Sequence, residues 1–108
     1  MVYLMSSRLA DKPIQEGQEL ISGDRHEEYG EAIQNMSDIV AGWNVIVTIA
    51  MSTYGKLMPF HVCLMMDWLK TCRACRSPDK MDSYTDKVGY AGLAYECAIK
   101  GRQDEKDS

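Results

Sequence analysis

Two carboxylates and two cations stand at helical spacing in the second half of this 108-residue sequence. Asp82 and Asp86 are four residues apart, so both side chains lie on one face of a helix. Carboxylate oxygens on a helix are typical magnesium ligands. Lys70 and Arg73 are three residues apart, and cations at that spacing can meet the oxygens of a phosphate group. The pattern predicts an anion site at Lys70 and Arg73, with Mg²⁺ held by Asp82 and Asp86.

Arg73 has an unusual position within its own segment. At 100° per residue, residues 60–76 place Arg73 inside an arc of apolar side chains, between Val62 and Met66. A buried guanidinium is unfavourable unless an anion pairs with it. Two alternatives follow. Arg73 either snorkels outward or pairs with a structural carboxylate, or it forms an anion site together with Lys70.

The elements that must position these residues are helices. Apolar residues recur at helical period along residues 31–53, 60–76 and 79–100, and a short helix is expected over residues 12–22. Pro59 opens the helix over residues 60–76. Asp79 is the expected N-cap of the helix over residues 79–100, and Gly101 is its expected end. We therefore expect an all-α fold, a compact bundle of about four helices. Residues 1–100 form one domain, and residues 101–108 are a polar tail.

The connections bring the candidate residues together. Residues 76–80 form a short link, which makes the helices on either side antiparallel neighbours. Lys70, Arg73, Asp82 and Asp86 should therefore lie in one neighbourhood. The polar run DRHEEYG, residues 24–30, is expected as a loop near this site.

Other residues complete the expected nucleotide site. Asp24 and Arg25 would close the pocket from the DRHEEYG loop, and Tyr29 or Trp43 would stack on a base. The nucleotide-binding set expected here is Lys70, Arg73, Asp24, Arg25, Tyr29 and Tyr90. No catalytic residue is assigned, because no nucleophile with a neighbouring base and no glycine-rich phosphate loop is present.

Composition excludes several classes of protein. The net charge is −4 and no run of lysines or arginines occurs, which argues against general nucleic-acid binding. We expect no membrane span and no secretory signal, and hence a cytoplasmic location. The four cysteines lack the spacing of a zinc site and are expected as buried thiols in a reducing compartment: Cys63, Cys72, Cys75 and Cys97.

A second apolar face predicts assembly. Val45 and Ile49 lie off the main apolar stripe of residues 31–53. A helix that is apolar on two sides is either central in a bundle or part of a subunit interface. We expect a homodimer or larger assembly that buries the second half of this helix.

Four ordered blocks of residues carry a resemblance over residues 14–98. They are D-R-x-x-x-Y-G from Asp24, Asn35 with Trp43, L-M-M-x-x-L-K-x-x-R from Leu64, and D-x-x-x-D-x-x-G-Y from Asp82. This order resembles a family of small bacteriophage and prophage proteins. That family is similar to phage nucleotide-modification-associated helical domains and, distantly, to the MazG-type all-α nucleoside triphosphate pyrophosphohydrolases.

The resemblance implies a MazG-like helical bundle, dimeric or larger, with magnesium held by acidic helix residues. It also implies the host cytoplasm if the protein is phage-encoded. The pyrophosphohydrolases use an E-x-x-E pair and an E-x-x-D pair on successive helices. Here Glu16 and Glu19 stand on a short leading helix, and Asp82 and Asp86 are spaced by four.

Three functions stay open from the sequence. The first is nucleotide binding, extending to Mg²⁺-dependent hydrolysis of a nucleoside triphosphate. The second is a non-catalytic binder that sequesters a nucleotide signal of host defence. The third is a structural or interaction protein that docks a host protein, in which Arg73 pairs with Asp82 or Asp86 as a brace.

Overall fold

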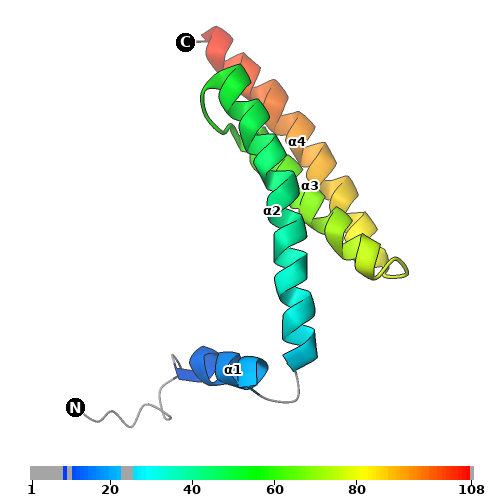
Figure 1. The fold of residues 1–108 in the computed structure, drawn as a ribbon. Helices are drawn as coiled ribbons and strands as arrows, with labels where there is room; N and C mark the ends of the chain where they lie inside the picture. The colour runs from blue at the N-terminus through cyan, green and yellow to red at the C-terminus, as the bar shows by residue number, and fades with distance from the viewer. Residues whose placement is uncertain (1–8, 10, 23–25, 108) are drawn as a thin grey trace, which may run out of the picture. The chain divides into compact units, whose positions relative to one another are not determined.

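The structure, a computed structural model, describes residue 9 and residues 11–22 and 26–107. It contains four α-helices: α1 (Asp11–Ser22), α2 (His26–Tyr54), α3 (Pro59–Arg76) and α4 (Met81–Asp107) (Figure 1). No strand occurs within these ranges. The expected all-α fold of about four helices is confirmed.

The chain divides into two compact units, residues 1–34 and residues 35–108. The first contains α1 and the start of α2. The second contains the rest of α2 together with α3 and α4, and it carries most of the candidate site residues.

Specific residues end α2 and begin α3. Gly55 has φ +74, a conformation that glycine adopts without strain, and its N–H donates to the Met51 carbonyl at 3.0 Å. Pro59 occupies the first turn of α3, where a missing N–H costs nothing. The Met58 N–H donates to Nδ1 of His61 at 2.9 Å, which satisfies a backbone group at the start of the helix. His61 is therefore a buried capping residue with an unprotonated Nδ1.

The start of α2 differs from the expectation. Residues 24–30 were expected as a loop, but α2 begins at His26. Glu27 and Glu28 in its first turn favour a helix N-terminus through the helix dipole. The loop prediction is therefore wrong from His26 onward, and Asp24 and Arg25 lie outside the described residues.

Both ends of α4 also differ from the expectation. The helix begins at Met81, so Asp79 lies in the turn before it and is not the N-cap. At the other end α4 continues through Gly101 to Asp107. One helical glycine costs about 1 kcal/mol relative to alanine, and the Arg, Gln, Glu and Lys residues that follow favour a helix. The predicted helix end at Gly101 is thus wrong.

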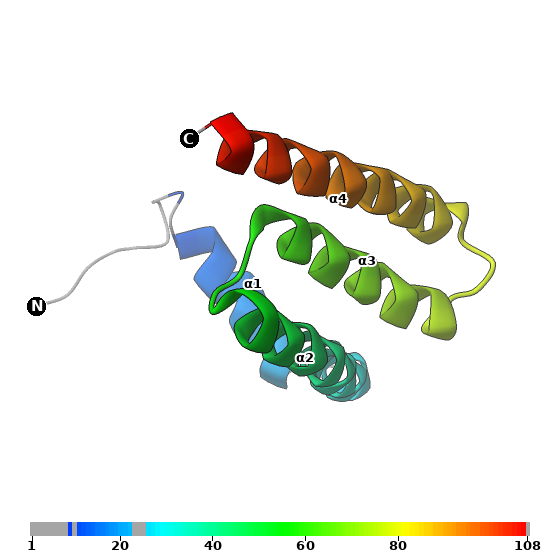
Figure 2. The same ribbon diagram turned by 90° about the horizontal axis from the view of Figure 1, so that it is seen from above.

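Within the second unit, α3 lies between α2 and α4 (Figure 2). Two indole groups tie α2 to α3. Trp43 Nε1 donates to the Met65 carbonyl at 2.7 Å, and Trp68 Nε1 donates to the Asp38 carbonyl at 3.1 Å. The Trp68 ring lies directly on Gly42, where a Cβ atom would fall 2.1 Å from Nε1. Glycine at this position allows the close approach.

Few apolar side chains are buried in the described residues. The buried apolar side chains are mostly small: Ile39, Ala50, Cys63, Cys72 and Ala94. Because α3 contacts α2 on one side and α4 on another, its two remaining sides are open. The second unit therefore exposes much of its apolar surface.

One segment meets the length and composition of a membrane span. It is the 24-residue stretch Glu31–Tyr54 of α2, with a mean hydropathy of 1.2. The expectation that no stretch reaches such a length is corrected, because residues 39–55 contain no charged side chain. Length and composition alone do not separate a membrane span from a helix that packs in a protein, and α2 does contact α3 through Trp43 and Trp68.

Candidate functional site

Lys70 and Asp86 meet across the α3–α4 contact. Lys70 Nζ lies 3.0 Å from Asp86 Oδ2, and the two side chains are 16% and 45% exposed. The short 77–80 connection makes the helices antiparallel, as expected, so the end of α3 lies beside the start of α4 (Figure 1). The predicted proximity of Lys70 and Asp86 is confirmed. Their roles as phosphate and metal ligands stay predictions.

Arg73 lies at the surface of α3. The part of the apolar arc around it is open to solvent: Val62 is 51% exposed and Arg73 is exposed, while Met66 and Leu69 are half-buried. Within the described residues Arg73 forms no ion pair. Outward snorkelling of Arg73, one of the alternatives left open by the sequence, fits this exposure, whereas pairing with a structural carboxylate is not observed among the described residues.

Asp82 and Asp86 are both less enclosed than expected. Asp82, one turn before Asp86 on α4, is exposed and makes no ion pair with another described residue. The described residues contain no group of three His, Cys, Asp or Glu side chains that would hold a metal ion. A Mg²⁺ ion bound by Asp82 and Asp86 would therefore take most of its ligands from water or substrate.

A second ion pair joins the same two helices with the charges reversed. Lys87 Nζ on α4 lies 2.7 Å from Asp67 Oδ1 on α3, and it also donates to Thr71 Oγ1. The two side chains of the pair are about 30% exposed. Together with Lys70 and Asp86, this pair sets the register of α3 on α4. Sequence analysis missed it, although Asp67 and Thr71 stand at i, i+4 spacing on the polar side of α3.

A third ion pair borders a pocket between α2 and α3. Arg76 Nη2 lies 2.5 Å from Asp38 Oδ2. The pocket beside it has a volume of about 460 Å³ and is lined by Asp38, Ala41, Trp68, Thr71, Cys72, Cys75 and Arg76. It contains the C-x-x-C pair, with Cys72 buried and Cys75 exposed. Exposure of Cys75 corrects the expectation that all four thiols are buried.

Burial keeps two thiols protonated. Burial is the main reason that the pKa of Cys72 lies above its ordinary value, and the Asp38 carboxylate raises that pKa further. Burial also raises the pKa of Cys63 above its ordinary value, and a hydrogen bond with Cys97 of α4 adds to the effect. Protonated thiols are poor nucleophiles and poor metal ligands, so these cysteines behave as core residues.

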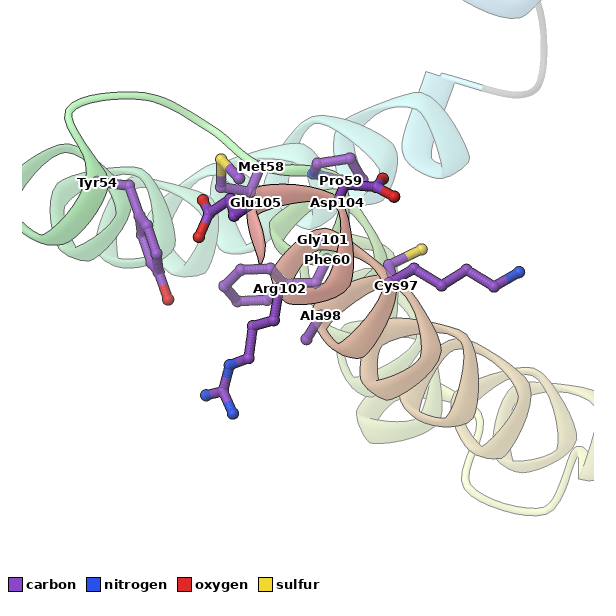
Figure 3. Close-up of a pocket in the computed structure, with 11 residues that line it drawn as sticks. Tyr54, Met58, Pro59, Phe60, Cys97, Ala98, Gly101, Arg102, Asp104 and Glu105 are labelled. Atoms are coloured by element: carbon purple, nitrogen blue, oxygen red, sulfur yellow. The ribbon is translucent and has the colours of Figure 1, made fainter. Parts of the chain in front are cut away.

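A further pocket lies at the other end of α3. Its volume is about 410 Å³, and it lies between the end of α2, the start of α3 and residues 97–105 of α4 (Figure 3). The Tyr54 and Phe60 rings meet edge to face, with centroids 5.8 Å apart. Arg102 lines the pocket together with Asp104 and Glu105. Sequence analysis missed this pocket because Phe60 and Arg102 are far apart in the chain.

The remaining predicted site residues are not brought to Lys70 by any observed contact. Tyr29 belongs to α2, but its side chain lies outside the described residues. Tyr90 is half-buried on α4, one turn after Asp86. Trp43 is also half-buried, and its indole N–H is bonded to the Met65 carbonyl. Trp43 therefore holds α2 against α3, which argues against the predicted base stacking.

Comparisons with known proteins identify a family. The family model described as "Domain of unknown function (DUF6378)" matches residues 12–98. The chain belongs to this family. It is also 28% identical over 105 residues to the "Gene 55 protein" of Mycobacterium phage D29, a match that covers 93% of the chain and 64% of that protein. The DUF6378 chain thus spans less than two thirds of this relative's length, and no solved structure matches it.

The match to a bacteriophage protein agrees with the resemblance to small phage proteins drawn from the four sequence blocks. Residues 12–98 include all four of these blocks. The family description carries no activity, so function has to be argued from the side chains.

Proposed function

We propose that this DUF6378 chain is a helical interaction protein that assembles with further copies of itself. The observation that supports this proposal is the exposure of large apolar side chains along α2, α3 and α4. Those of the second unit at least 44% exposed are Met36, Val40, Val45, Ile49, Met51, Tyr54, Leu57, Val62, Met81, Tyr84, Val88, Leu93 and Tyr95. Soluble monomers rarely expose apolar patches larger than a few hundred Å².

The charged residues support the same proposal. Lys70 and Lys87 are each within 3.0 Å of a carboxylate on the neighbouring helix. Both cations therefore serve to hold α3 on α4, which leaves less positive charge for a phosphate group. This arrangement favours the structural or interaction alternative over the phosphate-binding one.

Sedimentation equilibrium across micromolar concentrations tests the proposal. We expect a defined oligomer with a dissociation constant in the micromolar range or lower. A chain that sediments as a monomer at the highest concentration reached would contradict self-assembly. An interaction protein would then have to act on a host protein and not on a second copy of itself.

Nucleotide binding is a second candidate, supported by one observation. The guanidinium of Arg73 is exposed and outside any ion pair of the described residues, one turn from Lys70, and Asp82 offers an exposed carboxylate at the same end of the hairpin. The MazG resemblance would extend this candidate to Mg²⁺-dependent hydrolysis of a nucleoside triphosphate to the monophosphate and pyrophosphate. Without turnover, the same site would sequester a nucleotide. Either activity would take place in the cytoplasm.

A thermal-shift screen of nucleotides and cyclic nucleotides, with and without Mg²⁺, tests this candidate. A ligand that binds only the folded state adds about 2.7 kcal/mol of stability at 100 times its Kd. We expect any such gain to disappear in Arg73→Ala, while Lys56→Ala, which removes a distant exposed cation, should retain it. No stabilisation by any nucleotide would remove the candidate.

A further inference from the structure

Two stripes of side chains form one open face on the α3–α4 hairpin, called here the hairpin face. The α3 stripe, at i, i+4, i+7 and i+11 spacing, consists of Val62, Met66, Leu69 and Arg73. The α4 stripe, at the same spacing, consists of Asp82, Asp86, Gly89 and Leu93. The ion pair between Lys70 and Asp86 bridges the two helices next to both stripes. The stripes therefore lie on the same side of the hairpin.

The hairpin face is apolar for most of its length. Val62 is 51% exposed and Leu93 is 46% exposed. Gly89 has open space where a Cβ atom would stand, so another helix could approach α4 closely there.

The charges of the face stand at one end of it. Arg73, near the end of α3, and Asp82, in the first turn of α4, are both exposed and outside the ion pairs of the described residues. With Lys70 and Asp86, the face holds two cations and two anions. The whole chain has a net charge of −4, so two copies repel each other on average. The charge-balanced hairpin face is a surface on which two copies can approach.

We propose that a second copy of this chain covers the hairpin face, so that Arg73 of each copy pairs with Asp82 of the other. A two-fold axis that runs along the hairpin, between α3 and α4, places α3 of one copy on α4 of the other. Because α3 and α4 are antiparallel and Lys70 faces Asp86, Arg73 and Asp82 both lie about one turn closer to the 77–80 connection, at the same height along the hairpin. Rotation about this axis leaves that height unchanged, so Arg73 of one copy faces Asp82 of the other. Val62 and Met66 then meet the Leu93 and Gly89 side of the other copy. This inference rests on the proposed self-assembly and names its interface.

Charge reversal tests the pairing. The two single variants are Arg73→Asp and Asp82→Arg, and the combined variant carries both changes. Each single reversal places like charges together twice in a two-fold dimer, so we expect the dimer Kd to rise roughly tenfold or more. The combined variant restores opposite charges and should return the Kd to near the wild-type value. The controls Lys56→Asp and Glu31→Arg make the same charge changes at exposed positions outside the face and should leave the Kd near wild type.

Sedimentation equilibrium supplies the Kd, and circular dichroism checks that each variant is folded, as expected for exposed positions. Leu93→Lys provides a second test, because a lysine at the apolar end of the face should abolish the dimer whatever the pairing of Arg73. In the wild-type protein, added salt should raise the Kd, since exposed charge pairs are screened.

Single reversals that leave the Kd unchanged, or a combined variant no better than either single one, would overturn the proposed pairing. If the wild-type chain still assembles in that case, the interface lies elsewhere and the proposed function survives. A wild-type monomer at all concentrations would overturn both.

Discussion

Trp43 and Trp68 donate their indole N–H groups in opposite directions across the contact between α2 and α3. The Trp43 group reaches the Met65 carbonyl of α3 at 2.7 Å, and the Trp68 group reaches the Asp38 carbonyl of α2 at 3.1 Å. Both acceptors are backbone groups, so these two hydrogen bonds depend on the path of each helix. Together with the Arg76–Asp38 ion pair, the two tryptophans hold α2 on α3.

Gly42 allows this contact, and alanine there should disrupt it. A Cβ at Gly42 would lie 2.1 Å from Nε1 of Trp68, so Gly42→Ala has to displace the ring or the helix. We expect a loss of about 1–3 kcal/mol in the free energy of unfolding, measured by chemical denaturation. Gly92→Ala is the matched control, because no atom lies within 4 Å of its Cβ position. That change should stabilise the helix by about 0.5–1 kcal/mol, and equal effects at both positions would contradict the packing described.

The ion pair between Asp67 and Lys87 should stabilise α3 on α4 measurably. A double-mutant cycle with Asp67→Asn and Lys87→Met isolates the pair. Because the side chains are 28% and 31% exposed, we expect a coupling energy of about 1 kcal/mol. The same cycle on Glu96 and Lys100, which are 59% and 68% exposed, should show little coupling. Equal coupling in the two cycles would show that the Asp67–Lys87 pair is as solvated as a surface pair.

Thiol reactivity should follow burial. With a maleimide at neutral pH, Cys75 should react first because it is exposed, whereas the buried Cys63 and Cys72 should react only as the chain unfolds. Mass spectrometry of the digested protein identifies the modified residue. Rapid labelling of Cys63 in the folded chain would contradict its burial.

The Cys63 thiol should also make stability depend on pH. Its folded pKa is raised above the ordinary value of 9.0, so the unfolded state loses this proton at a lower pH than the folded state. The contribution is fully present below the unfolded pKa and is lost as pH rises through the folded pKa. We therefore expect the free energy of unfolding to fall above about pH 9, and Cys63→Ala should reduce that slope. A slope that is unchanged in Cys63→Ala would assign the effect to other groups.

The exposed side of α2 should contribute to assembly if the expectation drawn from Val45 and Ile49 is right. These side chains are 59% and 55% exposed in the single chain. Replacing both with Asp should weaken self-association by more than tenfold, because a charged carboxylate would have to be desolvated at the interface. Gln15→Asp with Gln103→Asp adds the same two charges at other exposed positions and serves as the control. Light scattering that reports the same mass for both variants would contradict a role for this side of α2.

Local signals along the chain determined the helices and one contact between them. Apolar period and Pro59 are short-range features, and they predicted α3 and its boundaries closely. The short 77–80 connection was enough to predict that Lys70 and Asp86 are neighbours, because a tight turn leaves two helices little choice but to lie antiparallel. The start of α2 at His26 and the end of α4 at Asp107 were not predicted. A polar stretch or a single glycine does not end a helix where the flanking residues favour one.

Only the tertiary structure decided which side of each helix is covered. The part of α3 around Arg73 is apolar in sequence, yet it is open to solvent because α3 contacts α2 through Trp68 on one side and α4 through Lys70 on another. The Asp67–Lys87 pair could not be predicted from the sequence either, since it depends on the rotation of α4 about its own axis. A periodic pattern shows that a side chain is apolar or charged. What surrounds that side chain depends on residues distant in the chain, and so on the packing of the whole unit.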